Sequence, residues 1–532
     1  MFSNEQHDSR RIADVVIVGG GSAGVVLAAR LSAEPTRTVH LLEAGHAYAR
    51  NAIPSDLLDP AHVPGEADHD WGWKMRGNER NPEIVAPRGK ALGGSSSVNA
   101  TVAMRATPDD IRKWNEHGLE GWTVAEVAET FKAMENTPTG DDRYHGRTGP
   151  FPVRQLSYDE LTSSLKAFID AGAAEGYARV ADFNSPDRAG IGPYPVNVVD
   201  GKRQSTALVY LTDEVRARPN LTIEGDVLVD RVVFDQARAT GVVSADGVVY
   251  HAREIVLSAG VYASPAILLR SGIGPGADLS ALGIPVVADL PVGQRLVDQP
   301  FYYNAYALDP GHLDQRPASG ALLWLASSQA RGDELDLHVT ATHLMDPSMS
   351  PTGGAIVLAT GLVAPDSRGT LRLRSRDPRE QPEIDNNYFA EERDRVRFLE
   401  GVKLGRRIAR NPIMAPLTAG EMIPGDTVQD DGALADAVFG FVNSYGHPAA
   451  TAPMGGAGDE WAVVDSYGAV KGVEGLRVID ASIMPEVPTV ATNPTVIMIA
   501  EHLARTIYGR GARDRSLVDA TEETWSQRVL SA

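Results

Sequence analysis

One segment near the N-terminus constrains this chain more than any other. Asp14–Val18 is a short β-branched apolar run, typical of a buried parallel strand. The glycine turn Gly19–Gly24 (GGGSAG) follows at once, and the Ala-rich stretch Val25–Leu31 after it predicts a helix. Thr38–Leu42 predicts a second strand, which ends at Glu43. This order of strand, glycine turn, helix, strand and acid predicts a dinucleotide-binding unit.

Each part of this motif has a physical role. Gly19 permits the tight turn, Gly21 lets the backbone approach a pyrophosphate, and Gly24 allows close packing of helix on strand. Glu43 lies 19 residues after Gly24, where an acid accepts hydrogen bonds from ribose hydroxyls. A glycine turn without a ligand would leave Glu43 unexplained. The motif alone leaves FAD and NAD open, and no second unit of this kind follows in the sequence.

Composition excludes several classes of function. The 532 residues suggest roughly two to four folded units, and the net charge of −20 argues against nucleic acid or an anionic membrane as a partner. Without cysteine, disulfides, iron–sulfur clusters and thiol catalysis are excluded. No apolar run reaches the ~18 residues of a membrane span. The pair Arg10-Arg11 is similar to the start of a twin-arginine export signal. The apolar run after it, Val15–Val18, is too short for the core of such a signal, so we expect a cytoplasmic protein.

A second loop of small residues, Gly89–Asn99, offers backbone and hydroxyl donors suited to a phosphate or a flavin ring. A flexible linker is the alternative, but linkers rarely carry residues such as Leu92 and Val98. Further along, three strands are predicted: Val227–Val233 and Gly241–Tyr250 as a hairpin, and the buried strand Glu254–Gly260.

The second half of the chain has a different pattern. Residues 301–345 and 355–374 alternate apolar and polar positions, which predicts a more antiparallel sheet. Glu391–Arg410 predicts an amphipathic helix, Leu476–Ser482 a buried strand and Thr495–Thr506 an apolar helix. We expect the tail 511–532 to pack loosely. The fold class is therefore mixed α/β.

Among the 13 histidines, one is a catalytic candidate. His447 lies in a loop of small residues, and Pro448 restricts its backbone. A histidine fixed near a flavin can take an alcohol proton at neutral pH, although a structural loop histidine is the alternative. His338 and His343 are five residues apart on a predicted strand, so at most one can face a pocket. We expect His502 to be a packing residue and no metal to be bound.

At this point the sequence resembles the glucose–methanol–choline (GMC) oxidoreductase family. The resemblance runs from about Asp14 to Tyr508 and is carried by ordered motifs. Beyond the glycine turn, these are Gly89–Asn99 with Met104-Arg105 and Asp110, Ser264–Gly274, Leu290–Gly293 with Asp298, Pro365–Gly369 with Pro382–Tyr388, His447–Gly455, and Asp480–Pro485.

The resemblance implies that FAD is the cofactor and that His447 is the base on the substrate side. It also implies a set of cofactor-binding residues, with Asn493 a further catalytic candidate. The set is Gly19, Gly21, Ser22, Ala23, Gly24, Glu43, Ala44, Leu92, Gly94, Ser95, Asn99, Ala100, Val102, Val229, Asp480, Ala481, Asn493, Pro494 and Thr495.

Three departures from the family pattern matter. Val98 stands where members with covalent FAD carry a histidine, so we expect non-covalent FAD. Gln299 stands where histidine is common. The second catalytic position, usually His or Asn, falls on Ala491 by ungapped spacing. Either His447 works without a polar partner there, or Asn493, two residues later, substitutes.

The implied fold is a Rossmann-type FAD-binding domain with an inserted antiparallel-sheet substrate domain. The expected FAD-binding parts are 12–155, 196–300 and 441–510, and the substrate-binding parts are 156–195 and 301–440. The implied reaction oxidises the CH–OH group of a small alcohol or sugar-like substrate by base-assisted hydride transfer to flavin N5. Oxygen or another acceptor then reoxidises the flavin. A flavin-containing lyase remains the alternative, whereas a light-driven decarboxylase is expected to need a cysteine. Neither the substrate nor the oligomeric state is predicted.

Overall fold

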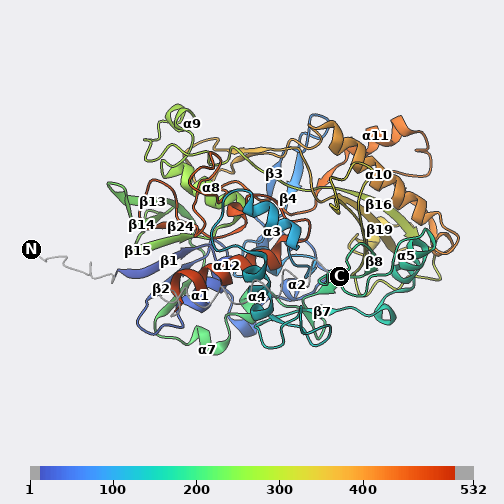
Figure 1. Cartoon of the computed structure of the whole chain (residues 1–532), viewed down its shortest axis with the longest axis horizontal. Helices are drawn as coiled ribbons and strands as arrows, with labels where there is room; N and C mark the ends of the chain where they lie inside the picture. Colours follow the sequence, from blue (N-terminus) through green and yellow to red (C-terminus); the bar gives the residue numbers. More distant parts are fainter. Residues whose placement is uncertain (1–11, 510–532) are drawn as a thin grey trace, which may run out of the picture.

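The structure, a computed structural model, describes residues 12–509. It contains two large sheets that lie side by side (Figure 1), one built around the N-terminal strand and the other carrying the long helix α10 (Glu392–Ala409). This arrangement confirms the predicted mixed α/β class. The tail expected over 511–532 lies outside the described residues.

The first sheet has a parallel core. Its order is β12-β2-β1-β15-β14-β13, with β24 pairing β15 on the other side. The strands are β1 (Ala13–Val18), β2 (Val39–Leu42), β12 (Leu221–Glu224), β13 (Val229–Asp235), β14 (Arg238–Ser244), β15 (Val249–Leu257) and β24 (Leu476–Val478). The predicted β1 and β2 are confirmed and lie at its centre, because apolar side chains on both faces suit a strand covered by helices.

Helix α1 (Ser22–Leu31) leaves β1 through the glycine turn. Gly19 has a φ of +96°, and a Cβ on Gly24 would lie only 1.9 Å from the Gly19 carbonyl oxygen. Any larger residue at position 24 would therefore push helix and strand apart. Helix α12 (Thr492–Tyr508) packs against α1, so the start of the C-terminal helix lies beside the N-terminal turn.

The predicted hairpin has different boundaries in the structure. The stretch Gly241–Tyr250, predicted as one strand, contains the end of β14, a turn at Gly247 and the start of β15. The hairpin of β13 and β14 turns at Gln236, whose φ is +55°, between the two predicted strands. The sequence prediction therefore missed the turn at Gly247 and joined the end of β14 to the start of β15.

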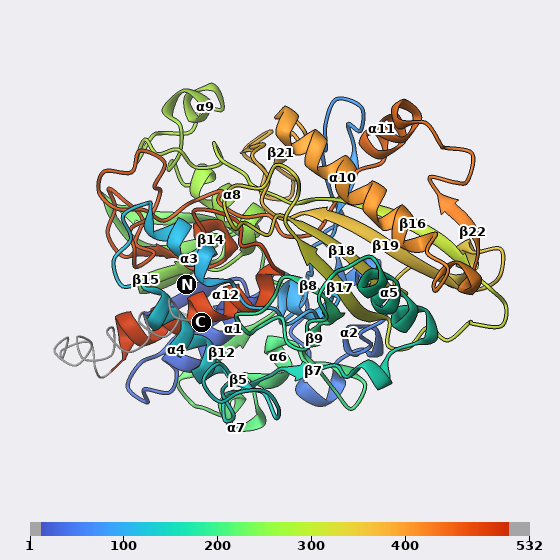
Figure 2. The same cartoon turned by 45° about the vertical axis from the view of Figure 1, so that its right-hand side comes forward.

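The second sheet is antiparallel, in the order β22-β16-β19-β18-β17-β8, with β23 pairing the start of β16. Its strands are β8 (Gly190–Pro193), β16 (Pro300–Leu308), β17 (Ser319–Leu325), β18 (Leu337–Thr342), β19 (Ala355–Leu362), β22 (Thr418–Ile423) and β23 (Asn443–Ser444). The antiparallel prediction for this region is therefore confirmed. One face packs on α10 and α5 (Ser163–Ala174), and Figure 2 shows α10 crossing this sheet.

The remaining elements cover and connect the two sheets. The other helices are α2 (Ser55–Leu58), α3 (Pro108–Asn115), α4 (Val124–Met134), α6 (Thr206–Val209), α7 (Asp213–Arg216), α8 (Gly260–Arg270), α9 (Gly276–Ala281) and α11 (Asp431–Gly440). Short strand pairs are β3 (Trp73–Met75) with β4 (Ile84–Ala86), β5 (Glu135–Asn136) with β6 (Phe151–Pro152), β7 (Arg154–Gln155) with β9 (Pro195–Val196), β10 (Val198–Val199) with β11 (Lys202–Arg203), and β20 (Thr370–Arg372) with β21 (Glu383–Asp385). Within residues 12–509, no helix combines the length and apolar character needed to cross a bilayer.

Candidate active site

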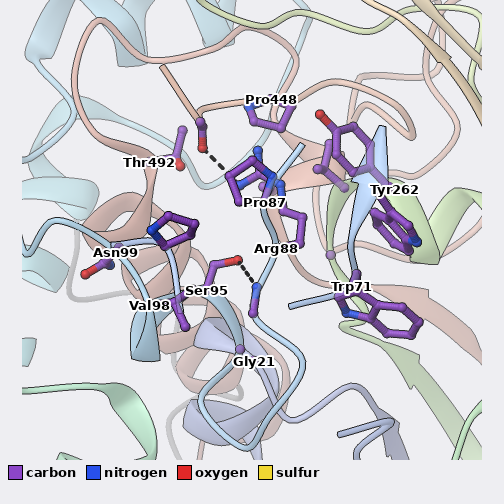
Figure 3. A pocket seen from close by; sticks show the side chains of 18 of the residues that line it. Gly21, Trp71, Pro87, Arg88, Ser95, Val98, Asn99, Tyr262, Pro448 and Thr492 are labelled. Atoms are coloured by element: carbon purple, nitrogen blue, oxygen red, sulfur yellow. Dashed lines mark hydrogen bonds between the residues drawn. The ribbon is translucent and has the colours of Figure 1, made fainter. Parts of the chain in front are cut away.

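One cavity of about 1030 Å³ connects the glycine turn of the first sheet with a face of the second. This volume is at the top of the range of ~300–1,000 Å³ that is typical of small-molecule sites. Figure 3 looks into the cavity, with Ser95, Val98 and Asn99 on one side of the view and Trp71 and Tyr262 on the other. The space therefore suits an extended cofactor together with a small substrate.

The glycine turn forms one end of the cavity. A Cβ on Gly94 would lie 2.7 Å from the Cα of Gly21, so the two glycine-rich loops touch through their backbones. Glu43 closes this end: its Oε2 accepts a hydrogen bond from the Gly20 N–H and its Oε1 accepts one from the Gly45 N–H, each at 2.8 Å. Burial raises the pKa of the Glu43 carboxyl to about 7.

Most of the predicted cofactor residues line this cavity. They are Gly19, Gly21, Ser22, Ala23, Glu43, Ala44, Gly94, Ser95, Asn99, Ala100, Val102, Val229, Asp480, Ala481 and Asn493. Four others do not line it: Gly24, Leu92, Pro494 and Thr495 are buried behind its wall. Gly24 still shapes the site, because it lets α1 begin so close to β1.

Asp480 and Asn493 tie the cofactor end to the C-terminal part of the chain. Asp480 is 3% exposed, and its Oδ2 accepts hydrogen bonds from Ser264 Oγ at 2.6 Å and from the Gly260 N–H at 2.8 Å. Asn493 Oδ1 accepts a hydrogen bond from Ser22 Oγ at 2.8 Å. The Asn493 side chain therefore faces the start of α1.

His447 borders the cavity from the loop after β23. Its Nδ1 lies 2.7 Å from Gln299 Oε1. The Gln299 amide nitrogen donates to two backbone carbonyls, Val363 O at 2.8 Å and Pro488 O at 2.9 Å. Because both amide protons are used, Oε1 is the acceptor and His447 Nδ1 must carry the proton. The lone pair of a neutral His447 is therefore on Nε2.

Asp298 fixes the loop that carries His447. This buried carboxylate accepts hydrogen bonds from Ser444 Oγ and Tyr388 Oη at 2.6 Å each, and from the His447 backbone N–H at 3.2 Å. Burial raises its pKa. Asp298 and Gln299 are adjacent, so one dipeptide positions both the backbone and the ring of His447.

Burial and a nearby positive charge both favour the neutral form of His447. Burial is the main cause that lowers its pKa to about 3, and the positive charge of Arg88 lowers it further. Arg88 donates from Nη1 to the Gly446 carbonyl at 3.0 Å, and its guanidinium lies 5.4 Å from the centre of the Tyr262 ring. Its Nε and Nη2 atoms are buried without a partner among the described residues.

The second sheet supplies the opposite wall. Phe301, His338 and Thr340 project from β16 and β18 into the cavity, and the Tyr445 ring stacks on Phe301 with centroids 4.0 Å apart and an interplanar angle of 13°. Tyr445 in turn lies 4.5 Å from the His447 ring. Of the two histidines predicted on opposite faces, His338 lines the cavity, whereas His343 hydrogen-bonds Ala355 O and Thr162 outside it.

The residues at the cofactor end fit FAD. The closely spaced glycines leave room for a pyrophosphate, the start of α1 offers backbone donors, and the cavity-lining Asn493 has a buried Nδ2 atom without a partner in the described chain. Val98 lines the same cavity and carries no nucleophile. Residues 12–509 bring together no group of three or more His, Asp or Glu side chains suited to a metal ion.

Sequence reasoning missed three residues of this site as functional candidates, Arg88, Gln299 and Tyr445, and it did not decide between His338 and His343. Gln299 is the one that the sequence could have identified, because it follows Asp298 in a family motif and replaces the histidine that is usual there. Arg88 and Tyr445 carry no local signal, since contacts between distant segments bring them to the cavity.

Comparisons with known proteins agree with the fold. The model of the N-terminal part of GMC oxidoreductases matches residues 13–301, and the model of the C-terminal part matches residues 365–500. A protein of Paraburkholderia phymatum named oxygen-dependent choline dehydrogenase is 36% identical over 542 aligned residues, which cover 94% of each chain. A relative of the same name from Burkholderia multivorans is also 36% identical and covers 95% of each chain.

Solved structures are similar over the same length. Pyridoxine 4-oxidase from Mesorbium loti superposes with a TM-score of 0.85 at 32% identity, covering 93% of this chain and 99% of that one. Aspergillus oryzae formate oxidase, with a TM-score of 0.82 at 24% identity over 92% of this chain and 97% of its own, supports the fold alone. The chain therefore belongs to the GMC oxidoreductase family, and it is an FAD-dependent alcohol oxidoreductase.

Proposed function

We propose that this chain oxidises the CH–OH group of a small alcohol, with His447 as the general base and non-covalently bound FAD as the cofactor. The hydrogen bond from His447 Nδ1 to Gln299 Oε1 carries the proposal, because it leaves the Nε2 lone pair free at the cavity. A base with a lone pair, next to a cofactor site with room for a substrate, is what alcohol oxidation requires.

The residues of this site divide the chemistry among them. His447 Nε2 accepts the hydroxyl proton, and loss of that proton makes the carbon a better hydride donor. When bound, FAD supplies the hydride acceptor. Arg88, anchored to Gly446 beside the base, contributes a fixed positive charge that favours negative charge developing on the substrate oxygen. General-base assistance of this kind is typically worth ~10²–10⁴-fold in rate.

Asn493 is better explained as a cofactor residue than as a second catalytic group. Its Oδ1 is held by Ser22 at the start of α1, and Ala491 lines the cavity where the family usually has a polar side chain. We therefore propose that His447 works without a polar partner at position 491. We further propose that the first sheet and the parts of the chain around it bind FAD, and that the second sheet binds the substrate, with the domain boundaries expected from the sequence.

The relatives guide the choice of substrate and acceptor. Their names indicate choline and oxygen, and the structural neighbour's name indicates pyridoxine. We propose a small alcohol as the substrate and oxygen as the first acceptor to test. Every protein reported above is named as a redox enzyme, which supports oxidation over the lyase alternative.

The test is anaerobic bleaching of the flavin by a panel of alcohols in the purified holoenzyme. His447→Ala should keep FAD bound and slow the bleaching by about 10²-fold or more. His251→Ala is the matched control, because His251 is exposed on the first sheet, away from the cavity. Unchanged bleaching in His447→Ala would exclude His447 as the base, and the absence of bleaching by every alcohol would favour the lyase.

A further inference from the structure

His338 is a buried polar side chain that the proposed chemistry does not use. It is 2% exposed, lines the cavity from β18 and has no partner for its Nε2 atom within residues 12–509. A buried polar nitrogen without a hydrogen bond costs stability. Native proteins tolerate this mainly where a ligand or an ordered water completes the bond.

The position of His338 places it in the substrate part of the cavity. In the sheet register, His338 pairs with Gly361, and Gly361 pairs with Phe301. A Cβ on Gly361 would lie 2.9 Å from the Tyr445 ring, so this glycine lets one edge of the Tyr445 ring approach the sheet next to Phe301 and His338. Tyr445 also contacts His447, so it links His338 to the proposed base.

The hydrogen-bonding state of His338 follows from its neighbours. Its Nδ1 lies 3.3 Å from Tyr445 Oη. Burial is the main cause that raises the pKa of the Tyr445 phenol, so this group keeps its proton and can donate it to Nδ1. Burial is also the main cause that lowers the pKa of His338 to about 3, and repulsion from a protonated His447 would lower it further. The ring is therefore neutral, and when Tyr445 donates to Nδ1 its single proton is on the unpartnered Nε2.

The rest of this wall favours a flat, uncharged substrate. Phe301, Tyr303 and Tyr445 provide aromatic surface, and Leu322 and Val357 provide aliphatic surface. Asp346 is the one carboxylate that the described residues place on this side of the cavity, and it is exposed. We propose that His338 is a substrate-binding residue that donates a hydrogen bond from Nε2 to an acceptor atom on the ring of an aromatic alcohol.

This inference rests on the proposed function and names the substrate class of the same site. Benzyl alcohol and the three pyridylmethanols are matched probes, because they differ only in one ring atom that accepts a hydrogen bond. At pH 8, where the pyridine ring is uncharged, the best pyridylmethanol should half-saturate anaerobic flavin reduction of the wild-type holoenzyme at a concentration about tenfold lower than benzyl alcohol does.

The variants separate a substrate contact from a structural role. In His338→Leu the tenfold difference between the two probes should disappear, whereas His338→Gln, which keeps a donor, should restore part of it. His343→Gln is the matched control, because His343 is buried near β18 but lies outside the cavity, and it should keep the wild-type ratio. The effect should fall on the half-saturating concentration rather than on the limiting rate of reduction.

The outcomes are distinguishable from those of the proposed function. If no alcohol reduces the flavin, the proposed function fails. If alcohols reduce it but wild type does not distinguish the probes, or His338→Leu keeps the full ratio, the assignment of His338 is overturned. The wild-type comparison needs no variant, so poor folding of His338→Leu would not protect the inference.

Discussion

Gln299 Oε1 lies 2.7 Å from His447 Nδ1, and both amide protons of Gln299 are donated to backbone carbonyls. The glutamine side chain cannot turn without losing two buried hydrogen bonds. It therefore selects one tautomer of His447, the proposed base, in the manner of the carboxylates and carbonyls that orient histidines in other sites.

Replacing Gln299 should affect the base without affecting the cofactor. Gln299→Leu should slow anaerobic flavin reduction by about tenfold or more, because His447 loses its orienting partner. Flavin content and the midpoint of thermal unfolding serve as controls for cofactor binding and folding. Equal rates in wild type and Gln299→Leu would show that the hydrogen bond does not position the base.

The pH profile gives a second readout for the same pair. The pKa of His447, lowered to about 3 by burial and by Arg88, keeps its lone pair available, so wild-type flavin reduction should not fall between pH 8 and pH 5. In Gln299→Glu, a carboxylate beside Nδ1 should raise the pKa of His447. The rate of flavin reduction should then fall with decreasing pH at a higher pH than in wild type, and a profile identical to wild type would contradict this.

The hydrogen bond between Ser22 and Asn493 predicts coupled effects on FAD affinity. Each single replacement by alanine should weaken FAD binding about fivefold, as expected for one hydrogen bond of ~1 kcal/mol. The double variant should lose little more than either single variant, because both changes remove the same contact. Titration of the apoprotein with FAD measures this. If Asn493→Ala binds FAD with native affinity but reduces the flavin tenfold more slowly, Asn493 contacts the substrate rather than supporting the cofactor.

Val98 predicts that FAD is not covalently attached. The side chain lines the cavity but has no nucleophilic atom, and the whole chain lacks cysteine. Acid precipitation should therefore release all the yellow colour into the supernatant. Flavin fluorescence that stays with the washed, denatured protein would show that another residue forms a bond.

His145 predicts a loss of stability at alkaline pH. Its Nδ1 lies 3.0 Å from Glu135 Oε1 and its Nε2 lies 2.7 Å from Asp182 Oδ2. Burial opposes the charged ring, but the two carboxylates outweigh it and raise the pKa of His145 to about 9. Since this value exceeds that of the unfolded chain, the stabilisation is complete below pH 6.5 and is lost as the pH rises through 9.

The expected loss between pH 6.5 and 9.5 is on the order of 2 kcal/mol in the free energy of unfolding. Denaturant unfolding at several pH values measures it, and His145→Gln should flatten this part of the profile. A wild-type stability that does not change over this range would contradict the assignment of a charged His145.

The sequence was most informative where function depends on local backbone geometry. The βαβ unit and the Gly89–Asn99 loop could be predicted because glycines at fixed spacing have one structural explanation, and the family motifs placed His447. The roles of the individual cofactor and catalytic residues stay predictions until variants are measured. The prediction of Gly241–Tyr250 as one strand was wrong, because a turn at Gly247 separates β14 from β15.

The substrate wall could not be predicted from local pattern. His338 and His343 look equivalent along the chain, and only the pairing of β18 with β17 and β19 decides which one faces the cavity. Gly361 carries no motif, and its importance arises from a tyrosine 84 positions away in the chain. Contacts of this kind follow from tertiary packing, which a single sequence does not reveal.

Asp298 and Gln299 directly precede β16, which carries Phe301. This arrangement affects how the substrate range could be altered. These residues hold the loop, the ring of the base and the ring of Tyr445 within a single short stretch of backbone. Mutations on β16 that reshape the wall will therefore disturb the base as well, and libraries there should yield mostly inactive variants. Positions on β18 touch the same wall without this connection, so new specificities should be easier to evolve from that strand.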